Sequence, residues 1–130
     1  MMNDSISDLI IRIKNGGAAK KSSVSMPYSN LTWSIAEKLA DRGYTKAPMK
    51  KGKEVKHIEL ELVYNENGQP RITGVKRMSH LSKRIYKGFR DIHRVKQGYG
   101  SLVISTPKGI MMDDEARKAK VGGEILFSIW

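Results

Sequence analysis

The sequence predicts an α+β fold of two small packed lobes. Three observations support this class: helical spacing of apolar residues near the N-terminus, alternation of apolar and polar residues over 57–63, and glycine-separated apolar strands at the C-terminal end. Residues 1–65 are expected to form a helix–strand–helix–hairpin lobe, and residues 66–130 a mostly β lobe with short helices. We place the boundary there because Asn65–Pro70 concentrates the turn-forming residues of the chain.

Two helices are expected in the first lobe. Apolar residues at i, i+3, i+4 and i+7 predict the first, with Asn3 or Asp4 as its cap and Asn15-Gly16-Gly17 as its end. The second is expected over about 31–42, capped by Pro27–Asn30 and followed by Gly43. Its buried stripe should comprise Leu31, Ile35 and Leu39, and Trp33 is expected to pack rather than to stack on a base.

Three strands should complete this lobe, at residues 22–26, 44–49 and 57–63. In the last of them Ile58, Leu60 and Leu62 point inward. Five lysines crowd around Gly52 at the tip of the hairpin that the second and third strands form, and either a solvated turn or a phosphate contact accounts for them (Lys46, Lys50, Lys51, Lys53 and Lys56).

The second lobe opens with a basic stretch in which Tyr86 and Phe89 are interleaved with cations (Lys76, Arg77, Lys83, Arg84, Lys87, Arg90, Arg94 and Lys96). Such a mixture suits an RNA surface, because cations neutralise phosphates while rings stack or pack on sugars. The alternative is a strand with Ile85 inward and its cations solvated. Ile92 and Val95 suggest one short helix after it.

The C-terminal quarter should contain a strand at 100–105, a polar loop, a helix over Asp113–Ala119 and a final strand at 121–130. The loop consists of Ser105, Thr106, Pro107, Lys108 and Gly109. Its hydroxyls, cation and permissive glycine could approach a polar surface closely.

Composition limits the classes of function. A formal charge of +11 on 130 residues indicates a polyanionic partner, nucleic acid rather than membrane, since no apolar run reaches spanning length. The polar, acidic start argues against a signal peptide. The absence of cysteine excludes disulfides and thiolate metal sites and fits a reducing compartment.

These segments together resemble the universal small-subunit ribosomal protein family number eight. The C-terminal signature is carried by the 105–109 loop, the acid-led helix and Gly122-Gly123-Glu124. Residues 4–15, 26–29 and 83–86 resemble other segments of the family in the same order, and the bacterial form is the better match. Pro107 stands where the family usually has a second serine, so one hydroxyl and one N–H are missing.

The resemblance implies a structural constituent of the small subunit that binds the central domain of its rRNA and stabilises a folded junction. The resemblance and the charge pattern together predict which residues bind RNA. They are Ser105, Thr106, Pro107, Lys108, Gly109, Tyr86, Lys83, Arg84, Lys87 and Glu124. Neighbouring ribosomal proteins and the protein's own mRNA are further partners that it implies, on a cytoplasmic or an organellar ribosome. No membrane, small-molecule substrate or cofactor is expected.

The sequence raises two other functions. One is a free-standing regulator that binds structured mRNA or DNA. The other is a nuclease built on Asp113, Asp114 and Glu115, which we discount because consecutive acids fan out over different faces of a helix and serve its first turn. No catalytic spacing of His, Ser or carboxylates is present, so no enzyme is expected.

Overall fold

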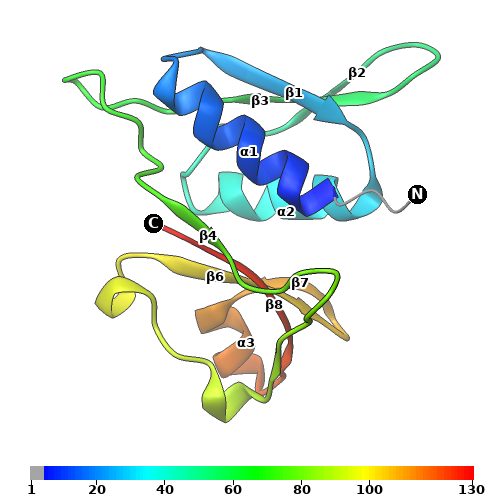
Figure 1. The fold of residues 1–130 in the computed structure, drawn as a ribbon, viewed down its shortest axis with the longest axis vertical. Coiled ribbons are helices and arrows are strands. Elements are labelled where there is room, and N and C mark those ends of the chain that lie inside the picture. Colours follow the sequence, from blue (N-terminus) through cyan, green and yellow to red (C-terminus); the bar gives the residue numbers. More distant parts are fainter. Residues whose placement is uncertain (1–4) are drawn as a thin grey trace. The chain divides into compact units, whose positions relative to one another are not determined.

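The protein is described here by a computed structural model that covers residues 5–130 in detail. The chain divides into two compact units, the first ending at Thr73 and the second comprising Gly74–Trp130. The described residues form three α-helices and two antiparallel sheets (Figure 1), which confirms the α+β class. None of these helices has the length and apolarity needed to cross a bilayer.

The first unit packs two helices against a three-stranded sheet of order β1-β3-β2. Its elements are α1 (Ser5–Ala18), β1 (Ser23–Pro27), α2 (Asn30–Asp41), β2 (Met49–Lys51) and β3 (His57–Glu61). Apolar side chains from both helices and from β3 are fully buried in its core, among them Leu9, Ile35 and Ile58. Burial of this apolar face stabilises the unit.

Helix α1 continues past its expected end. The proposed cap at Asn3 or Asp4 lies outside the described residues, but the stop at Asn15-Gly16-Gly17 is wrong, because the helix runs to Ala18. Gly16 is needed for packing instead: a Cβ there would lie 2.4 Å from Cγ1 of Val24. The chain leaves the helix at Lys20, whose φ is +57°.

Helix α2 has the expected cap and a shifted buried face. The Thr32 N–H donates to Oγ of Ser29 at 3.1 Å, and Gly43 follows the helix with φ +77°. Leu31 was assigned to the buried stripe wrongly, since it is 38% exposed while Thr32 is 2% exposed. The face is set by residues spaced i, i+3, i+4 and i+7 from Thr32 (Thr32, Ile35, Ala36 and Leu39).

The strand expected over 44–49 is also largely wrong. Only Thr45 forms a bridge, to Leu62, before β2 begins at Met49. Pro48 has no N–H to donate to a ladder, which explains the interruption. The alternation of β3 is confirmed, with Ile58 buried.

The lysines of the β2–β3 hairpin are partly paired. Lys51 lies 2.8 Å from the Glu59 carboxylate, and Lys46 lies 3.4 Å from Glu61. The hydrogen bond from Lys51 holds the pKa of the Glu59 carboxyl below its ordinary value.

Trp33 packs against Tyr28 with ring centroids 6.0 Å apart.

The turn at Asn65–Pro70 does not end the first unit. Oδ1 of Asn65 accepts the N–H groups of Asn67 and Gln69, and Tyr64 pairs with Pro70 across the turn. The Arg71 N–H then donates to the Val63 carbonyl at 2.8 Å. These bonds hold residues 66–73 in the first unit, so the division falls later than the expected boundary after residue 65.

The second unit is built on a five-stranded antiparallel sheet of order β4-β8-β6-β7, with β5 also paired to β8. Its strands are β4 (Val75–Arg77), β5 (Tyr86–Lys87), β6 (Ser101–Thr106), β7 (Gly109–Met112) and β8 (Gly123–Ile129). The helical elements are α3 (Asp113–Ala119) and two 3-10 turns, η1 (Phe89–Asp91) and η2 (Lys96–Gly98).

Several expectations for this unit are confirmed and two are wrong. The two apolar strands and the helix over Asp113–Ala119 are present as β6, β8 and α3. The polar loop, however, is mostly the hairpin β6–β7, whose turn is only Pro107-Lys108. The single helix expected around Ile92–Val95 is also absent, since η1 and η2 flank these residues and Ile92 has extended backbone (φ −86°, ψ 111°).

A β-bulge divides the pairing of β8 with β6. Val103 faces Phe127, but the next residue of β6, Ile104, faces Ile125, so Leu126 is the extra residue. Ile104 and Ile125 consequently lie on the same face of the sheet, where they pack with Ala116 of α3 in one core cluster. We call this side of the sheet the α3 face.

Helix α3 is attached to the sheet by a buried acid. Asp113 is 4% exposed, and its carboxylate accepts the Leu102 N–H at 3.1 Å and pairs with Arg117 at 2.9 Å. Glu115 accepts the Met112 N–H at 2.9 Å, closing the first turn of the helix. Asp113 and Glu115 therefore each serve the structure of the helix start.

We expect Asp113→Ala to lower the free energy of unfolding by about 2–4 kcal/mol, because it leaves the buried Leu102 N–H and the Arg117 guanidinium without their partner. Asp114→Ala, at an exposed position of the same turn, should cost under about 1 kcal/mol. Urea denaturation of both variants measures the difference, and equal losses would mean that the first turn acts only through the helix dipole.

Candidate nucleic-acid interface

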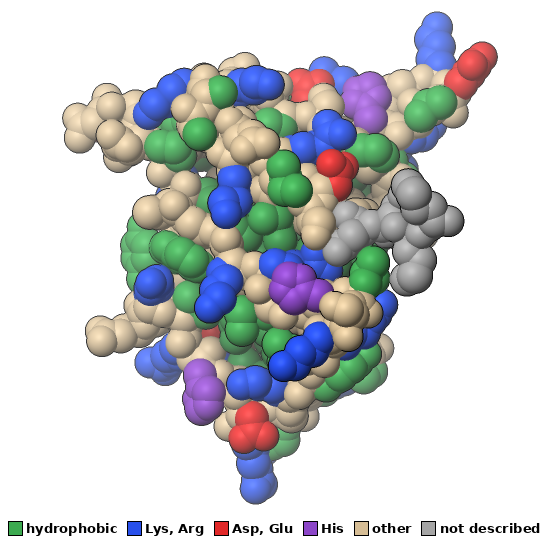
Figure 2. Space-filling model, viewed as in Figure 1, with side chains coloured by type: hydrophobic (Ala, Val, Ile, Leu, Met, Phe, Trp, Pro, Cys, Tyr) green, Lys and Arg blue, Asp and Glu red, His purple; other side chains and the backbone are tan. Residues whose placement is uncertain are grey.

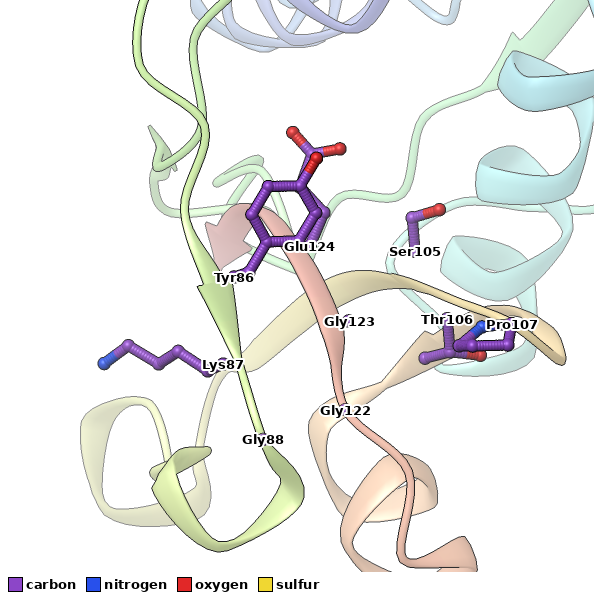
Figure 3. Close-up of a pocket in the computed structure, with 9 residues that line it drawn as sticks. All are labelled: Tyr86, Lys87, Gly88, Ser105, Thr106, Pro107, Gly122, Gly123 and Glu124. Atoms are coloured by element: carbon purple, nitrogen blue, oxygen red, sulfur yellow. The ribbon is translucent and has the colours of Figure 1, made fainter.

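One row of side chains crosses three strands of the second unit. Tyr86 of β5 pairs with Glu124 of β8, which pairs in turn with Ser105 of β6. Residues directly opposite in an antiparallel sheet share a face, and alternation places this row on the face opposite α3. Figure 3 shows the three side chains pointing to the same side of the sheet. The predicted residues Tyr86, Ser105 and Glu124 are thus brought together.

The row borders a shallow hollow of about 560 Å³, which we call the tyrosine hollow. It is lined by Tyr86, Lys87, Gly88, Ser105, Thr106, Pro107, Gly122, Gly123 and Glu124 (Figure 3). Six of the predicted binding residues, Lys87 among them, therefore line one hollow. They come from three separate stretches of the sequence. From the sequence alone, Gly122 and Gly123 are predicted only to be turn residues and part of the family signature.

The two glycines at the start of β8 let three backbones approach closely. A Cβ at position 123 would lie 2.0 Å from the Ser105 carbonyl oxygen, and one at position 122 would lie 2.3 Å from the Lys87 carbonyl oxygen. Real Cβ atoms do not approach backbone so closely. Both positions consequently need glycine, and the floor of the tyrosine hollow is largely backbone.

The β6–β7 turn is held by the hydroxyl of Thr106. Its Oγ1 accepts the Lys108 N–H at 3.1 Å and donates to the Gly109 carbonyl at 2.7 Å, and the residue is 9% exposed. Gly109 has φ +109°, which favours glycine. Thr106 therefore shapes the turn, while Ser105, Pro107 and Lys108 are the more accessible residues of the predicted loop.

Tyr86 and Glu124 differ in exposure. The tyrosine is 66% exposed and offers its ring and hydroxyl, whereas the Glu124 side chain is 15% exposed. Oε1 of Glu124 accepts from Nη1 of Arg84 at 3.2 Å. This pair joins two predicted binding residues and fixes the carboxylate beside the tyrosine hollow.

Ser79 positions the basic segment and was missed in the sequence. Its buried hydroxyl accepts the Ile85 N–H at 2.8 Å, and the Ile85 carbonyl accepts the Ile125 N–H at 2.8 Å. These bonds attach the chain just before Tyr86 to β8. A lone serine ahead of a basic run gives no sequence signal of such a role.

The cations of the predicted site are all exposed but do not converge. Lys83 lies in a tight turn with reciprocal backbone bonds to His80, and Lys108 lies at the tip of the β6–β7 turn. The side chain of Lys87 points away from Tyr86 and Glu124 in Figure 3. Lys and Arg greatly exceed Asp and Glu on the face drawn in Figure 2.

Among residues 5–130, no three or more His, Asp or Glu side chains are grouped so that they could hold a metal ion. The arrangement at the tyrosine hollow instead offers an exposed phenol, a free-standing serine hydroxyl, a fixed carboxylate and exposed backbone, rimmed by cations. These groups can exchange hydrogen bonds with a polar, anionic surface that has its own hydroxyl groups.

Comparison with known proteins identifies the family. The family described as ribosomal protein S8 matches residues 4–130. The chain belongs to the ribosomal protein S8 family. This confirms the resemblance inferred from the sequence, and the chain is a structural protein of the small ribosomal subunit by family.

Similar S8 proteins span the whole chain. The small ribosomal subunit protein uS8 of Nautilia profundicola is 41% identical, covering 100% of both chains. Those of Nitrobacter hamburgensis and Dechloromonas aromatica are 42% and 44% identical, covering 98% and 96% of this chain and 98% and 95% of theirs. All three relatives are bacterial, in keeping with the bacterial-type signature of the sequence.

We expect Gly123→Ala to destabilise this S8 protein by about 2–3 kcal/mol, near the upper end for inserting a methyl group into a packed site. The new Cβ would meet the Ser105 backbone, which cannot withdraw without breaking the β6–β8 pairing. Gly88→Ala is the matched control, because a Cβ there has nothing within 4 Å and φ is −72°. Thermal and urea unfolding measure both, and a Gly123→Ala protein of wild-type stability would refute the close-approach argument.

Proposed function

We propose that this protein binds directly to the central domain of small-subunit rRNA and stabilises its folded junction. The observation that carries the proposal is the row Tyr86–Glu124–Ser105 beside a hollow with a backbone floor. Membership of the S8 family and the names of its relatives, small ribosomal subunit proteins, support a ribosomal setting. A basic second unit, with twelve Lys and Arg against five Asp and Glu, supports a polyanionic ligand.

The mechanism we propose is recognition of RNA shape. An A-form minor groove is wide and shallow and is lined by 2′-hydroxyls, so it suits a sheet face without protruding bulk. Gly122 and Gly123 keep the floor low, and Ser105 supplies one hydroxyl that both donates and accepts. Glu124, held by Arg84, accepts from a 2′-hydroxyl or a base amino group rather than meeting a phosphate.

Tyr86 and the β6–β7 turn frame this contact. The tyrosine ring is exposed enough to pack on a sugar or a base at one side of the hollow. On the other side the turn presents Pro107 and Lys108, with Thr106 and Gly109 fixing its conformation. Pro107 pre-orders the turn through its fixed φ, which offsets part of the loss of a family hydroxyl.

Affinity comes from cations that neutralise phosphates. Lys83, Arg84 and Lys108 act around this contact, and Lys87 acts from the α3 face, toward which its side chain points. The proposed partners are the rRNA and neighbouring small-subunit proteins on a cytoplasmic ribosome, with the protein's own mRNA as a further RNA ligand. We propose no catalytic role and no cofactor. Copurification with small subunits distinguishes this function from that of a free-standing regulator.

Ser105→Ala should weaken binding to an rRNA junction fragment about fivefold to a hundredfold, because a polar RNA group at a buried contact loses its partner at a cost of about 1–3 kcal/mol. Stability should stay near wild type, since the Ser105 hydroxyl makes no hydrogen bond within residues 5–130. Filter binding at fixed salt and thermal melting provide the two readouts.

Thr106→Val serves as the contrast, because it removes both hydroxyl bonds that shape the turn. It should lower the melting temperature as well as the affinity. If Ser105→Ala binds the junction and a generic RNA duplex with wild-type affinity, specificity does not reside in the row and the proposed contact is wrong.

Neutralising Lys83 and Lys108 together should flatten the dependence of log affinity on log salt by about 0.7–0.9 for each phosphate contact removed. Binding to cognate and unrelated RNA should weaken alike. Lys14→Ala with Lys118→Ala removes the same charge from exposed helix positions and should leave the slope nearly unchanged. Equal slopes for the two double variants would assign Lys83 and Lys108 to solvent.

A further inference from the structure

A second hollow lies on the α3 face of the same sheet. Its volume is about 390 Å³, within the range of about 300–1,000 Å³ usual for small-ligand pockets. Lys76 pairs with Ser128, which pairs with Leu102, so these three lining residues form one row on this face. We call this second hollow the lysine hollow. The row Tyr86–Glu124–Ser105 lies on the opposite face, which makes the two sites distinct.

The cations around the lysine hollow have no acidic partners within residues 5–130. Lys76, Lys87 and Arg94 line it and form no ion pair there, whereas Arg84 and Arg117 elsewhere in the unit are paired with carboxylates. The Lys87 side chain points away from the tyrosine hollow, as Figure 3 shows. Positive charge left uncompensated at a concave surface attracts an external anion.

The fourth cation, Lys96, is placed by an aromatic contact. Its Nζ lies 4.9 Å from the centroid of the Trp130 ring, which also lines the hollow. A Cβ at Gly74 would lie 2.5 Å from the same ring. The indole therefore packs between the Gly74 backbone and Lys96, and it forms one wall of the hollow.

The rest of the lining is mixed in character. Met78, Leu102 and Ile125 supply an apolar part, while His93, Ser128 and Asp91 add groups that hydrogen-bond. The Asp91 carboxylate would repel an acidic peptide, but it can accept from a base N–H or a 2′-hydroxyl. A single ribonucleotide carries a group for each part of this lining. Its phosphate suits the cations, its flat base suits the apolar part, and its N–H and O–H donors suit Asp91.

We propose that the lysine hollow binds an unpaired nucleotide of RNA, with its phosphate on Lys76, Arg94 and Lys96 and its base against the apolar lining. This second contact rests on the proposed RNA-binding function for the class of its partner. The RNA then has two separate contact sites on the second unit, one on each face of its five-stranded sheet.

The test uses Trp130 as a reporter at the site. In the full-length Trp33→Phe protein Trp130 is the single tryptophan, and we expect adenosine 5′-monophosphate and a five-nucleotide adenosine RNA to change its fluorescence saturably. Lys76→Ala with Arg94→Ala should raise the dissociation constant at least tenfold. The matched control, Lys118→Ala with Lys120→Ala, removes equal charge from exposed positions outside the hollow and should change it less than twofold.

Three results would overturn the inference: no saturable change with either nucleotide probe, equal losses in the two double variants, or displacement of the RNA by a pentaglutamate peptide at equal concentration. Binding of the rRNA junction by the same proteins is measured in parallel. If the protein binds the junction but fails these tests, only the second contact site is disproved. If it fails to bind the junction, the proposed function itself is disproved.

Discussion

The second unit depends on the close approach of three backbones at Gly122 and Gly123. At this point the start of β8 passes so near the Lys87 and Ser105 carbonyls that no side chain fits between them. The approach allows β5 and β6 to pair with β8 on its two sides and aligns Tyr86, Glu124 and Ser105. A larger residue at either glycine would separate the strands and dissolve the row. The sheet and the proposed site therefore share one steric requirement.

Charge in this unit is distributed unevenly because its carboxylates are used internally. Asp113 secures α3 to β6, Glu115 closes the first turn of that helix, and Glu124 holds Arg84. Few acids remain to offset the exposed lysines, so the field outside the sheet stays positive. The same ion pairs that order the fold thus leave the surface suited to a polyanion.

How much the sequence predicts depends on whether a feature is local. Helix α3 and the strands β6 and β8 were predicted because their caps and apolar runs are local signals. The end of α1 was missed, since Gly16 serves packing against Val24 rather than termination. The candidate residues could be named from a resemblance, but their grouping into one row and the inward role of Thr106 depend on register and turn geometry. Neither is encoded in spacing along the chain.

The β-bulge at Leu126 makes the length of β8 more critical than the identity of its residues. With regular pairing from Phe127 onward, Ile125 would fall opposite Ser105 and Glu124 would turn toward the α3 face. The extra residue exchanges the faces to which these two side chains point. Ile125 therefore enters the core and Glu124 joins the row with Tyr86 and Ser105. Replacing Leu126 with another apolar residue preserves that count, whereas deleting a single residue between Glu124 and Phe127 exchanges the inside and the outside of the site. Among natural variants of this strand, substitutions should accordingly be far commoner than insertions or deletions.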